Sequence, residues 1–215
     1  MEYEQLKIFD VHRNQIGVAT REDVHRLGYW HEAFHCWFIS KEKGTDYIYL
    51  QLRSSTKKDY PNLLDITAAG HLLANETVQD GVREIKEEVG VEISFQELIP
   101  LGIIDYCVIR EDFIDKEIAN VFLYKSKKSF DDFTLQEEEV AGIVKAEFIH
   151  FAELWFGDRE SIRISGFEIK KDGNKILIDE NVGRNKFVPH QIKFYKTVIE
   201  KIKVNYGVRY GNFID

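Results

Sequence analysis

Residues 70–91, GHLLANETVQDGVREIKEEVGV, constrain the fold of this chain more than any other stretch. Four β-branched residues recur within it at offsets of four, three and four: Val78, Val82, Ile85 and Val89. This spacing predicts a helix whose apolar face packs against a sheet. Thr77 and Asp80 have the spacing of a capping box at the start of that helix, and Gly90 ends it.

Three carboxylates, Glu84, Glu87 and Glu88, occupy another face of the same helix. At about 100° per residue their mean direction lies roughly 130° from the apolar face, so they project together toward solvent or a cleft. Like charges at this spacing destabilise a helix, and a hard divalent cation reverses the sign of that interaction. The cluster therefore predicts a site for Mg²⁺ or Mn²⁺. A solvated acidic face is the alternative.

These residues resemble the Nudix box, in which Gly, five residues, Glu and seven residues precede Arg-Glu-apolar-any-Glu-Glu-any-Gly-apolar. Residues 83–91, REIKEEVGV, match every specified position of the second half. In the first half, five residues separate Gly70 from Glu76 as required, but six instead of seven separate Glu76 from Arg83. The shortening falls where the loop enters the helix. We therefore expect the helix carboxylates to keep their geometry and Glu76 to matter less than its place in the pattern implies.

The resemblance covers about residues 5–155 and implies an α+β Nudix fold, a mixed β-sheet sandwiched between helices. It places the Nudix hydrolase domain in residues 1–158, with residues 159–215 as a C-terminal hairpin and helix packed on the same domain. Hydrophobic alternation predicts strands at residues 6–11, 14–19, 31–40, 47–53, 115–124 and 144–151, and helical patterns occur at residues 21–27 and 152–156.

The C-terminal region continues this pattern. Residues 167–170 and 175–178 flank Asp172-Gly173-Asn174 as a hairpin, and a final helix is predicted to open at Val188-Pro189 and to run to Lys203. Its apolar stripe consists of Ile192, Phe194, Tyr195, Val198, Ile199 and Ile202. A stripe this wide must be buried, so the helix should cover the edge of the cleft or form a dimer.

Two histidines in a predicted strand invite a metal-binding interpretation. His31 and His35 point to the same face of that strand, about 13 Å apart. We expect structural or substrate-contact roles in preference to metal ligation, because no third ligand lies nearby in the sequence.

The resemblance also implies a metal site and its roles. Glu84, Glu87 and Glu88 would hold the metal, and an acidic residue in the strand at 115–124 would complete the site. Glu117 matches that position, with Asp115 two residues away on the same face. An exposed pair of charges at a sheet edge is the alternative for these two residues.

The catalytic roles follow from the same resemblance. The general base would be Glu84 or a carboxylate of the acidic loop at residues 136–142, where Glu139 is preferred over Glu138. Arg83 would orient the box by pairing with a carboxylate. A solvated charge run is the alternative for the loop.

A narrower resemblance concerns the approach to the box. Gln51, Arg53, Ser54, Lys57, Tyr60-Pro61, Asp65 and Ala69-Gly70-His71 look like the Nudix subgroup that contains isopentenyl diphosphate isomerase. It implies substrate-binding roles for Arg53, Lys57, Gly70 and His71. In the isomerase a catalytic Cys precedes the Gly-His pair, whereas this chain has Ala69. Without that thiol one of two acid/base groups is missing, so hydrolysis is favoured.

The composition limits the kinds of partner that this chain can bind. A net charge of −8 and a pI near 5.5 argue against nonspecific binding of nucleic acid or anionic membrane. No apolar run approaches the roughly 20 residues that span a bilayer, and residues 1–5 lack the features of a secretory signal. The only cysteines, Cys36 and Cys107, have no metal-site spacing, which fits a reducing cytoplasm.

These observations predict a cytoplasmic, Mg²⁺- or Mn²⁺-dependent Nudix hydrolase. Its partner would be a small-molecule substrate with a pyrophosphate linkage, a nucleoside diphosphate derivative or a similar organic diphosphate, and a homodimer is possible. Two alternatives remain, an isopentenyl diphosphate isomerase-like enzyme and a catalytically silent domain that binds a nucleotide. The intact Arg-Glu-x-x-Glu-Glu run argues against the silent domain, because repelling carboxylates are costly to keep together.

Overall fold

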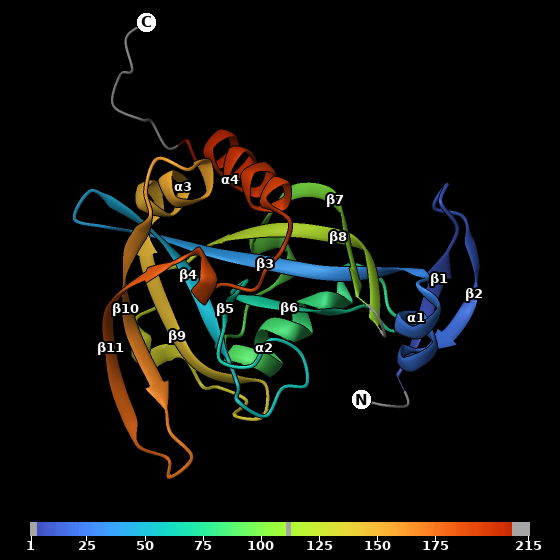
Figure 1. Ribbon diagram of the computed structural model, residues 1–215, viewed down its shortest axis with the longest axis horizontal. Coiled ribbons are helices and arrows are strands. Elements are labelled where there is room, and N and C mark those ends of the chain that lie inside the picture. The colour runs from blue at the N-terminus through green and yellow to red at the C-terminus, as the bar shows by residue number, and fades with distance from the viewer. Residues whose placement is uncertain (1–3, 111–112, 208–215) are drawn as a thin grey trace, which may run out of the picture.

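The computed structural model describes residues 4–110 and 113–207, and within them the fold is organised by an eleven-stranded sheet (Figure 1). Strand β3 (Trp30–Glu42) pairs antiparallel with β4 (Thr45–Arg53), as the predicted hairpin requires. On its other side β3 runs parallel to β8 (Phe113–Lys125), which forms a long hairpin with β7 (Leu98–Arg110). The sheet is therefore mixed, and the predicted α+β class is confirmed.

Beyond β4 the sheet continues through three antiparallel neighbours. These are β9 (Val140–Glu147), β10 (Ser161–Ile169) and β11 (Lys175–Gly183). The C-terminal hairpin predicted at residues 167–178 is thus present as the end of a longer pair, β10 and β11, which extends the sheet.

The N-terminal residues form the opposite end of the sheet. β1 (Gln5–Phe9) and β2 (Gln15–Thr20) make the predicted hairpin, and α1 (Arg21–Leu27) follows where a helical turn was expected. Two short strands, β5 (Leu64–Asp65) and β6 (Ala68–His71), pair with β4 and β3. They bring the chain across the centre of the sheet just before the carboxylate-bearing helix.

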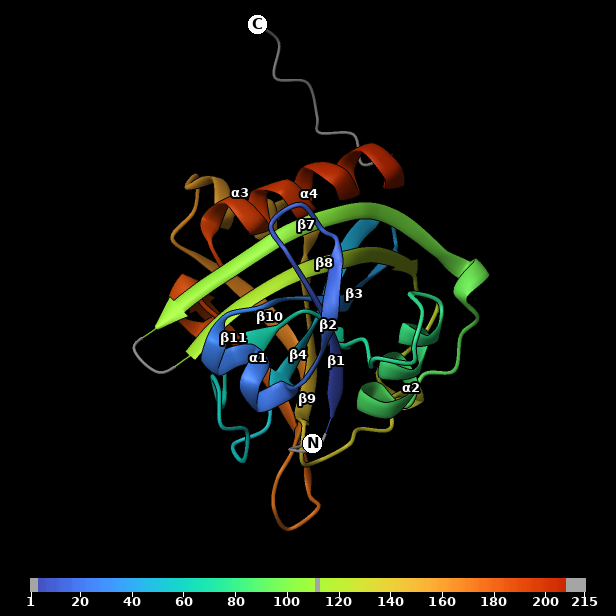
Figure 2. The ribbon, with the colours of Figure 1, turned by 90° about the vertical axis from the view of Figure 1, so that its right-hand side faces the viewer.

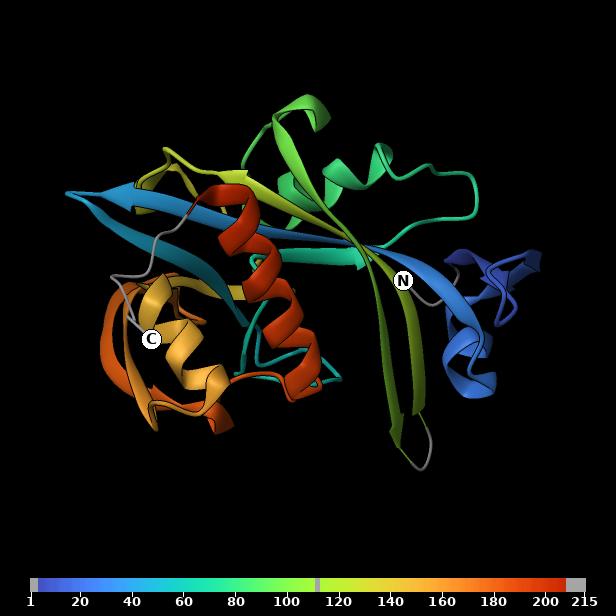
Figure 3. The same ribbon diagram turned by 90° about the horizontal axis from the view of Figure 1, so that it is seen from above.

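Helices cover both faces of the sheet: α2 (Arg83–Val89) lies on one side, and α3 (Phe148–Phe156) and α4 (Ile192–Tyr206) lie on the other (Figure 3). The alternation of β3 explains this layering, because successive side chains point to opposite faces. The residues packed with α2 are Phe34, Cys36 and Phe38, whereas those packed with α3 and α4 are Trp37 and Ile39.

Helix α2 has the buried face that its sequence predicts. Ile85 and Val89 are fully buried, and Val78 and Val82 pack at the border of the same cluster. Each fully buried side chain contributes roughly 2 kcal/mol. The start differs from the prediction, because a 3₁₀ turn, η1 (Asp80–Val82), precedes the regular helix. Only half of the predicted capping box forms: Asp80 accepts hydrogen bonds from the amide and hydroxyl of Thr77, while its own amide donates to the Thr77 carbonyl and not to the hydroxyl.

The two boundaries predicted where strand β9 meets helix α3 are wrong. The strand predicted at residues 144–151 ends at Glu147, and α3 begins at Phe148 instead of at residue 152. The apolar run there changes period within itself: Phe148, Phe151, Ala152 and Trp155 are buried at helical spacing. Hydrophobicity alone does not mark the point where a buried strand becomes a buried helix.

The C-terminal helix begins at Ile192, not at Val188-Pro189. The segment before it stays extended because the Val188 amide donates to the Leu64 carbonyl, at 2.8 Å. The apolar stripe of α4 is buried against the same chain, alongside β7 and α3 (Figure 2), although Ile192 itself is 49% exposed. Among the described residues, no helix has the length and apolar character needed to cross a membrane.

Candidate active site

A cleft of about 270 Å³ is lined by residues of β6, α2, β8 and the loops beside them. All ten residues predicted for the site line it: Arg53, Lys57, Gly70, His71, Arg83, Glu84, Glu87, Glu88, Glu117 and Glu139. They come from separate strands, loops and a helix. The fold therefore brings together residues that the sequence could place only one segment at a time.

Gly70 leaves space for the carboxylate of Glu84 in the cleft. A Cβ atom at Gly70 would overlap the carboxyl group of Glu84, so β6 and α2 can approach this closely only with glycine there. At the other end of α2, Gly90 adopts a left-handed conformation with φ 70°, and its amide donates to the Lys86 carbonyl. Gly70 thus permits the close approach of β6 to Glu84, and Gly90 ends the carboxylate-bearing helix.

Glu84 and Glu88 are buried acidic groups. Burial raises the pKa of Glu84 to about 7, and burial together with the charge of Glu84 raises the pKa of Glu88 to about 8. One oxygen of Glu88 accepts hydrogen bonds from the Ala69 amide at 2.9 Å and from Gln51 at 3.3 Å. Such a pair is costly when ionised alone, whereas a divalent cation would offset both the burial and the repulsion. The donor set fits a hard metal ion.

Arg83 aligns this group of carboxylates. Its guanidinium contacts Glu84 at 2.7 Å, Glu87 at 2.9 Å and both oxygens of Glu76. Glu76 also accepts a hydrogen bond from the Leu73 amide at 2.8 Å. Glu76 therefore lies where it anchors Arg83, and the shortened loop keeps it beside the helix.

Two basic side chains, Arg53 and Lys57, also line the cleft. Arg53 donates to Asp65 at 2.9 Å and, through two of its nitrogens, to the Asp59 carbonyl. Lys57 forms an ion pair with Glu139. Glu139 lies in the cleft, whereas Glu138 is not among its lining residues; the Glu138 carbonyl accepts a hydrogen bond from the Thr56 hydroxyl.

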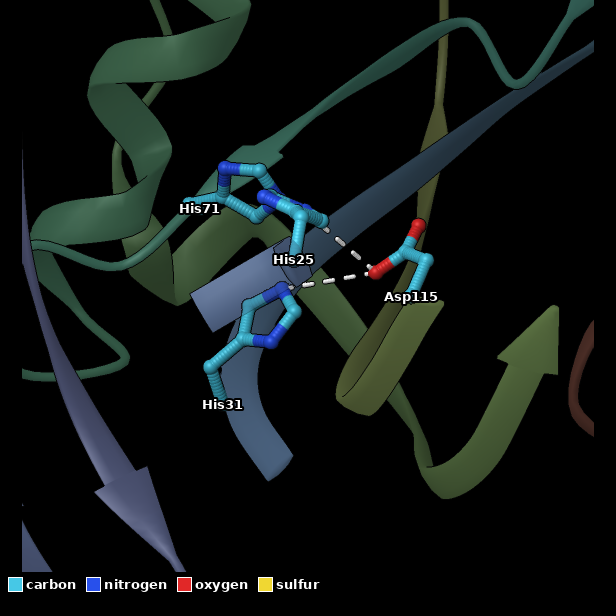
Figure 4. A group of neighbouring side chains, drawn as sticks. All are labelled: His25, His31, His71 and Asp115. Atoms are coloured by element: carbon cyan, nitrogen blue, oxygen red, sulfur yellow. Dashed lines mark ion pairs between the residues drawn. The ribbon is translucent and has the colours of Figure 1, made fainter. Parts of the chain in front are cut away.

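A second cluster of ligand-type side chains was not predicted. His25, His31, His71 and Asp115 converge from α1, β3, β6 and β8 (Figure 4), and one nitrogen or oxygen of each lies within 4.8 Å of the others. Oδ1 of Asp115 is 3.6 Å from Nε2 of His25 and 3.5 Å from Nε2 of His31. Among the described residues, His31 Nε2 and Asp115 Oδ1 are buried without a hydrogen-bond partner.

The cluster fits a transition-metal ion such as Zn²⁺ or Mn²⁺. Metal bonds of about 2.1 Å place neighbouring ligand atoms roughly 3–4 Å apart, so small side-chain rotations suffice. The other ring nitrogens donate to backbone carbonyls, His25 to Arg21 at 2.8 Å and His31 to Tyr29 at 3.2 Å, which leaves each Nε2 as the free ligand atom. Burial lowers the pKa of both His31 and His71, favouring the neutral form that binds metals.

The preference for structural or substrate-contact roles of His31 stays a prediction, but candidate co-ligands now lie around it. They come from three other elements, of which only α1 is close in the sequence, with His25 six residues before His31. His35 is not part of the cluster and instead contacts Glu117 at 3.0 Å. The available sequence signal was that His31 and His35 share one face of a strand and that Asp115 and Glu117 share one face of another, which becomes informative only when β3 is known to pair with β8.

Glu117 contacts two histidines of the cleft. Its carboxylate is 3.0 Å from His35 and 3.9 Å from His71. Burial raises its pKa, but the charge and hydrogen bond of His35 outweigh burial, so the pKa of Glu117 lies below its usual range. Its ion-pair contacts therefore join it to the histidine side of the cleft and not to α2.

Comparison with known proteins supports the fold first. A Deinococcus radiodurans protein of known crystal structure superimposes with a TM-score of 0.54 and 18% identity, over 69% of this chain and 86% of that one. No model of a protein family matches the sequence. The family is shown by proteins that are similar in sequence.

An uncharacterised Nudix hydrolase of Clostridium acetobutylicum is 35% identical over 211 residues, which are 96% of this chain and 100% of the relative. An isopentenyl-diphosphate Δ-isomerase 2 of Photorhabdus laumondii is 29% identical over 126 residues, 58% of this chain and 68% of its own length. The chain belongs to the Nudix hydrolase family, as predicted. It is thus an enzyme of a class that hydrolyses acid anhydrides and generally uses divalent metal ions.

Proposed function

We propose that this enzyme cleaves the pyrophosphate linkage of a nucleoside diphosphate derivative or a similar organic diphosphate, with Mg²⁺ or Mn²⁺ held by Glu84, Glu87 and Glu88. The observation that carries the proposal is that the buried Glu88 and the mostly buried Glu84, whose side chain is 12% exposed, share one cleft with Arg53 and Lys57. A diphosphate is strongly anionic, so its binding needs cations: a metal on the carboxylates and the basic side chains of the same cleft.

The residues divide the work between positioning and proton transfer. A divalent ion on the α2 carboxylates would neutralise the diphosphate and acidify a bound water. Arg83 keeps those carboxylates aligned through its contacts with Glu76, Glu84 and Glu87. Glu84 or Glu139 takes a proton from the attacking water. The new bond forms between water oxygen and phosphorus, the anhydride P–O bond breaks, and the leaving phosphate carries away the bridging oxygen.

The histidine cluster supplies a second place for a metal in the same enzyme. Both His25 and His71 line the cleft, so an ion held there would lie at the edge of the substrate site. Its ligands are softer than the α2 carboxylates, because three of the four are imidazoles. We therefore infer that the two sites select different metals, a transition metal at the histidines and Mg²⁺ at the carboxylates.

The test is a panel of nucleoside diphosphate derivatives and organic diphosphates scored for the two phosphate-containing products of cleavage, with and without Mg²⁺. Glu88→Gln and Glu87→Gln should each lower turnover by about three decades, or ~4 kcal/mol of transition-state stabilisation. Glu92→Gln is the matched control, since Glu92 is exposed and pairs with Lys86 outside the cleft. Activity that survives EDTA unchanged would contradict the proposal.

Allylic isomerisation of a diphosphate is the second candidate. It is favoured by the similarity to the Photorhabdus isomerase and by Glu117, a carboxylate of the cleft able to exchange a proton. Isomerisation needs a second acid/base group across the substrate, and the methyl group of Ala69 can neither give nor take a proton. We therefore expect no allylic isomer from isopentenyl diphosphate. Its appearance, at a rate abolished by Glu117→Gln, would replace the hydrolase proposal.

A further inference from the structure

The C-terminal segment reaches the wall of the cleft. Residues 187–191 lie between β11 and α4, and they are attached on both sides: the Val188 amide donates to Leu64 at 2.8 Å, and the Gln191 side chain donates to the Cys107 carbonyl at 2.9 Å. Val188 and His190 line the cleft with the predicted site residues. This segment is therefore a part of the substrate site as well as the connection to a packing helix.

His190 is tied to a basic residue of the cleft through one carboxylate. Its Nε2 lies 2.8 Å from Oδ1 of Asp65, whose other oxygen accepts from Nη1 of Arg53 at 2.9 Å. The side chains of His190 and Asp65 are 9% and 8% exposed, and that of Arg53 is 16% exposed. Tyr106 and Phe194 pack on the imidazole, with ring centroids at 5.0 Å and 5.2 Å, so its orientation is constrained.

The contacts of Asp65 limit how Arg53 can bind it. An unrestricted arginine–carboxylate pair prefers two parallel hydrogen bonds, one to each oxygen. Here Oδ1 is already occupied by His190 and by the Ile66 amide at 2.9 Å, so Arg53 reaches only Oδ2. Burial raises the pKa of Asp65, but the charges of His190 and Arg53 outweigh burial and leave the pKa well below its usual range. Asp65 is thus an ionised group shared by two partners.

Arg53 therefore keeps N–H groups that can bind a ligand. Its Nε and Nη2 donate to the Asp59 carbonyl at 3.1 Å and 2.8 Å, and Nη1 donates to Asp65. A guanidinium has five N–H groups, so these contacts leave one on each terminal nitrogen for a ligand in the cleft. Two N–H groups on the terminal nitrogens of a fixed guanidinium suit the oxygens of a phosphate.

We propose that His190 is a positioning residue for the substrate. By occupying one oxygen of Asp65, His190 restricts Arg53 to a single hydrogen bond with that carboxylate. The remaining N–H groups of Arg53 are then kept directed to a substrate phosphate. The proposal rests on the proposed function, because it deepens the role of the same cleft. Removal of the imidazole leaves the Ile66 amide as the remaining donor to Oδ1, so this oxygen gains room for a second hydrogen bond and Arg53 closes onto both oxygens of Asp65. Substrate affinity falls while the metal-binding carboxylates of α2 are unchanged.

Kinetics of His190 variants test this. With the best diphosphate substrate, His190→Ala should raise KM about 10-fold, equivalent to ~1.4 kcal/mol, and change kcat by less than about threefold. His190→Gln should restore KM, because its amide nitrogen can donate to Asp65, whereas the shorter side chain of His190→Asn should not. His150→Ala is the matched control: His150 is a half-buried histidine of α3 outside the cleft.

A double-mutant cycle separates positioning from general packing. Arg53→Ala should raise KM at least as much as His190→Ala, and adding His190→Ala to Arg53→Ala should have no further effect. An effect of His190→Ala that persists undiminished without Arg53 overturns the inference. So does loss of kcat and KM together in all three His190 variants, which is the result expected of damaged folding.

Binding of a non-hydrolysable probe keeps the inference apart from the proposed function. The Kd of methylenediphosphonate, measured by calorimetry with Mg²⁺ on the full chain, should rise about 10-fold in His190→Ala and remain near wild type in His190→Gln. Equal Kd values in wild type and His190→Ala overturn the inference even when the enzyme hydrolyses diphosphates. A protein that hydrolyses no diphosphate but shows this pattern of Kd values contradicts the proposed function and supports the inference.

Discussion

Removing the most deeply buried carboxylate of α2 should stabilise the metal-free protein. Glu88 is 7% exposed, and its pKa is raised from 4.5 to about 8 by burial and by the charge of Glu84. An acidic group with a raised pKa in the folded state binds its proton more tightly there than in the unfolded chain. Stability is therefore lost progressively as pH rises from about 4.5 to about 8, and is constant above.

The magnitude follows from the pKa values. At about 1.4 kcal/mol per pH unit, the folded state of the metal-free enzyme is disfavoured by about 3 kcal/mol at pH 7 through Glu88. Glu88→Gln removes this cost, and the side-chain oxygen of Gln can still accept the hydrogen bond from the Ala69 amide. Because the new amide must itself remain buried, we expect a net gain of ~2 kcal/mol, or roughly 4–8 °C in Tm for a chain of 215 residues.

The assay is thermal unfolding in EDTA from pH 5 to pH 8.5, for wild type, Glu88→Gln and the exposed control Glu92→Gln. The difference in Tm between Glu88→Gln and wild type should grow with pH up to about 8, and Glu92→Gln should follow wild type. Saturating Mg²⁺ should raise the Tm of wild type and have less effect on Glu88→Gln. A Glu88→Gln variant that unfolds below wild type in EDTA at pH 8 would refute the reasoning, because the carboxylate would then stabilise the fold without a metal.

Three further outcomes are expected. At saturating Mg²⁺, Glu76→Gln should lower turnover less than Glu88→Gln, because Glu76 acts through Arg83; equal losses in the two variants would place Glu76 among the metal ligands. Enzyme purified without chelator should contain about one equivalent of a transition metal by mass spectrometry. His31→Ala should lose this metal but keep the dependence of its activity on Mg²⁺. Equal metal content in both proteins would exclude the histidine cluster as the site. Gly70→Ala should displace Glu84 and lower kcat by at least about tenfold while the far-UV circular dichroism stays unchanged, and wild-type kcat would show that the close approach of β6 and α2 is not needed.

Local patterns were sufficient wherever an element and its role lie within one stretch of the chain. The apolar spacing of Ile85 and Val89 and the grouped carboxylates of α2 are properties of a few helical turns, so both the buried face and the cleft-facing charges of that helix could be predicted. The hairpin of β3 and β4 was predictable for the same reason, because its strands and its turn at Gly44 are contiguous. The resemblance to the Nudix box then indicated the family.

Element boundaries were harder to predict where a buried strand passes directly into a buried helix. The run from Val144 to Trp155 is buried on both sides of Glu147, and burial of a strand and burial of a helix select the same residue types. The strand ends where pairing of β9 with β4 gives way to packing of α3 against α4. The same holds for Val188-Pro189, where a favourable helix start is overridden by the hydrogen bond to Leu64.

The two constellations that the prediction missed depend on long-range pairing. The parallel register of β3 and β8 brings the segment containing Asp115 beside His31, and α1 and β6 then add His25 and His71. His190 reaches Asp65 only because residues 187–190 return to β5. A sequence shows the residue types but not which strands become neighbours, since that choice minimises the free energy of the whole core. Helix periodicity, the Nudix motif and the excess of negative charge could be read from the chain alone, whereas the cluster of His25, His31, His71 and Asp115 and the C-terminal wall of the cleft arise from packing between distant segments.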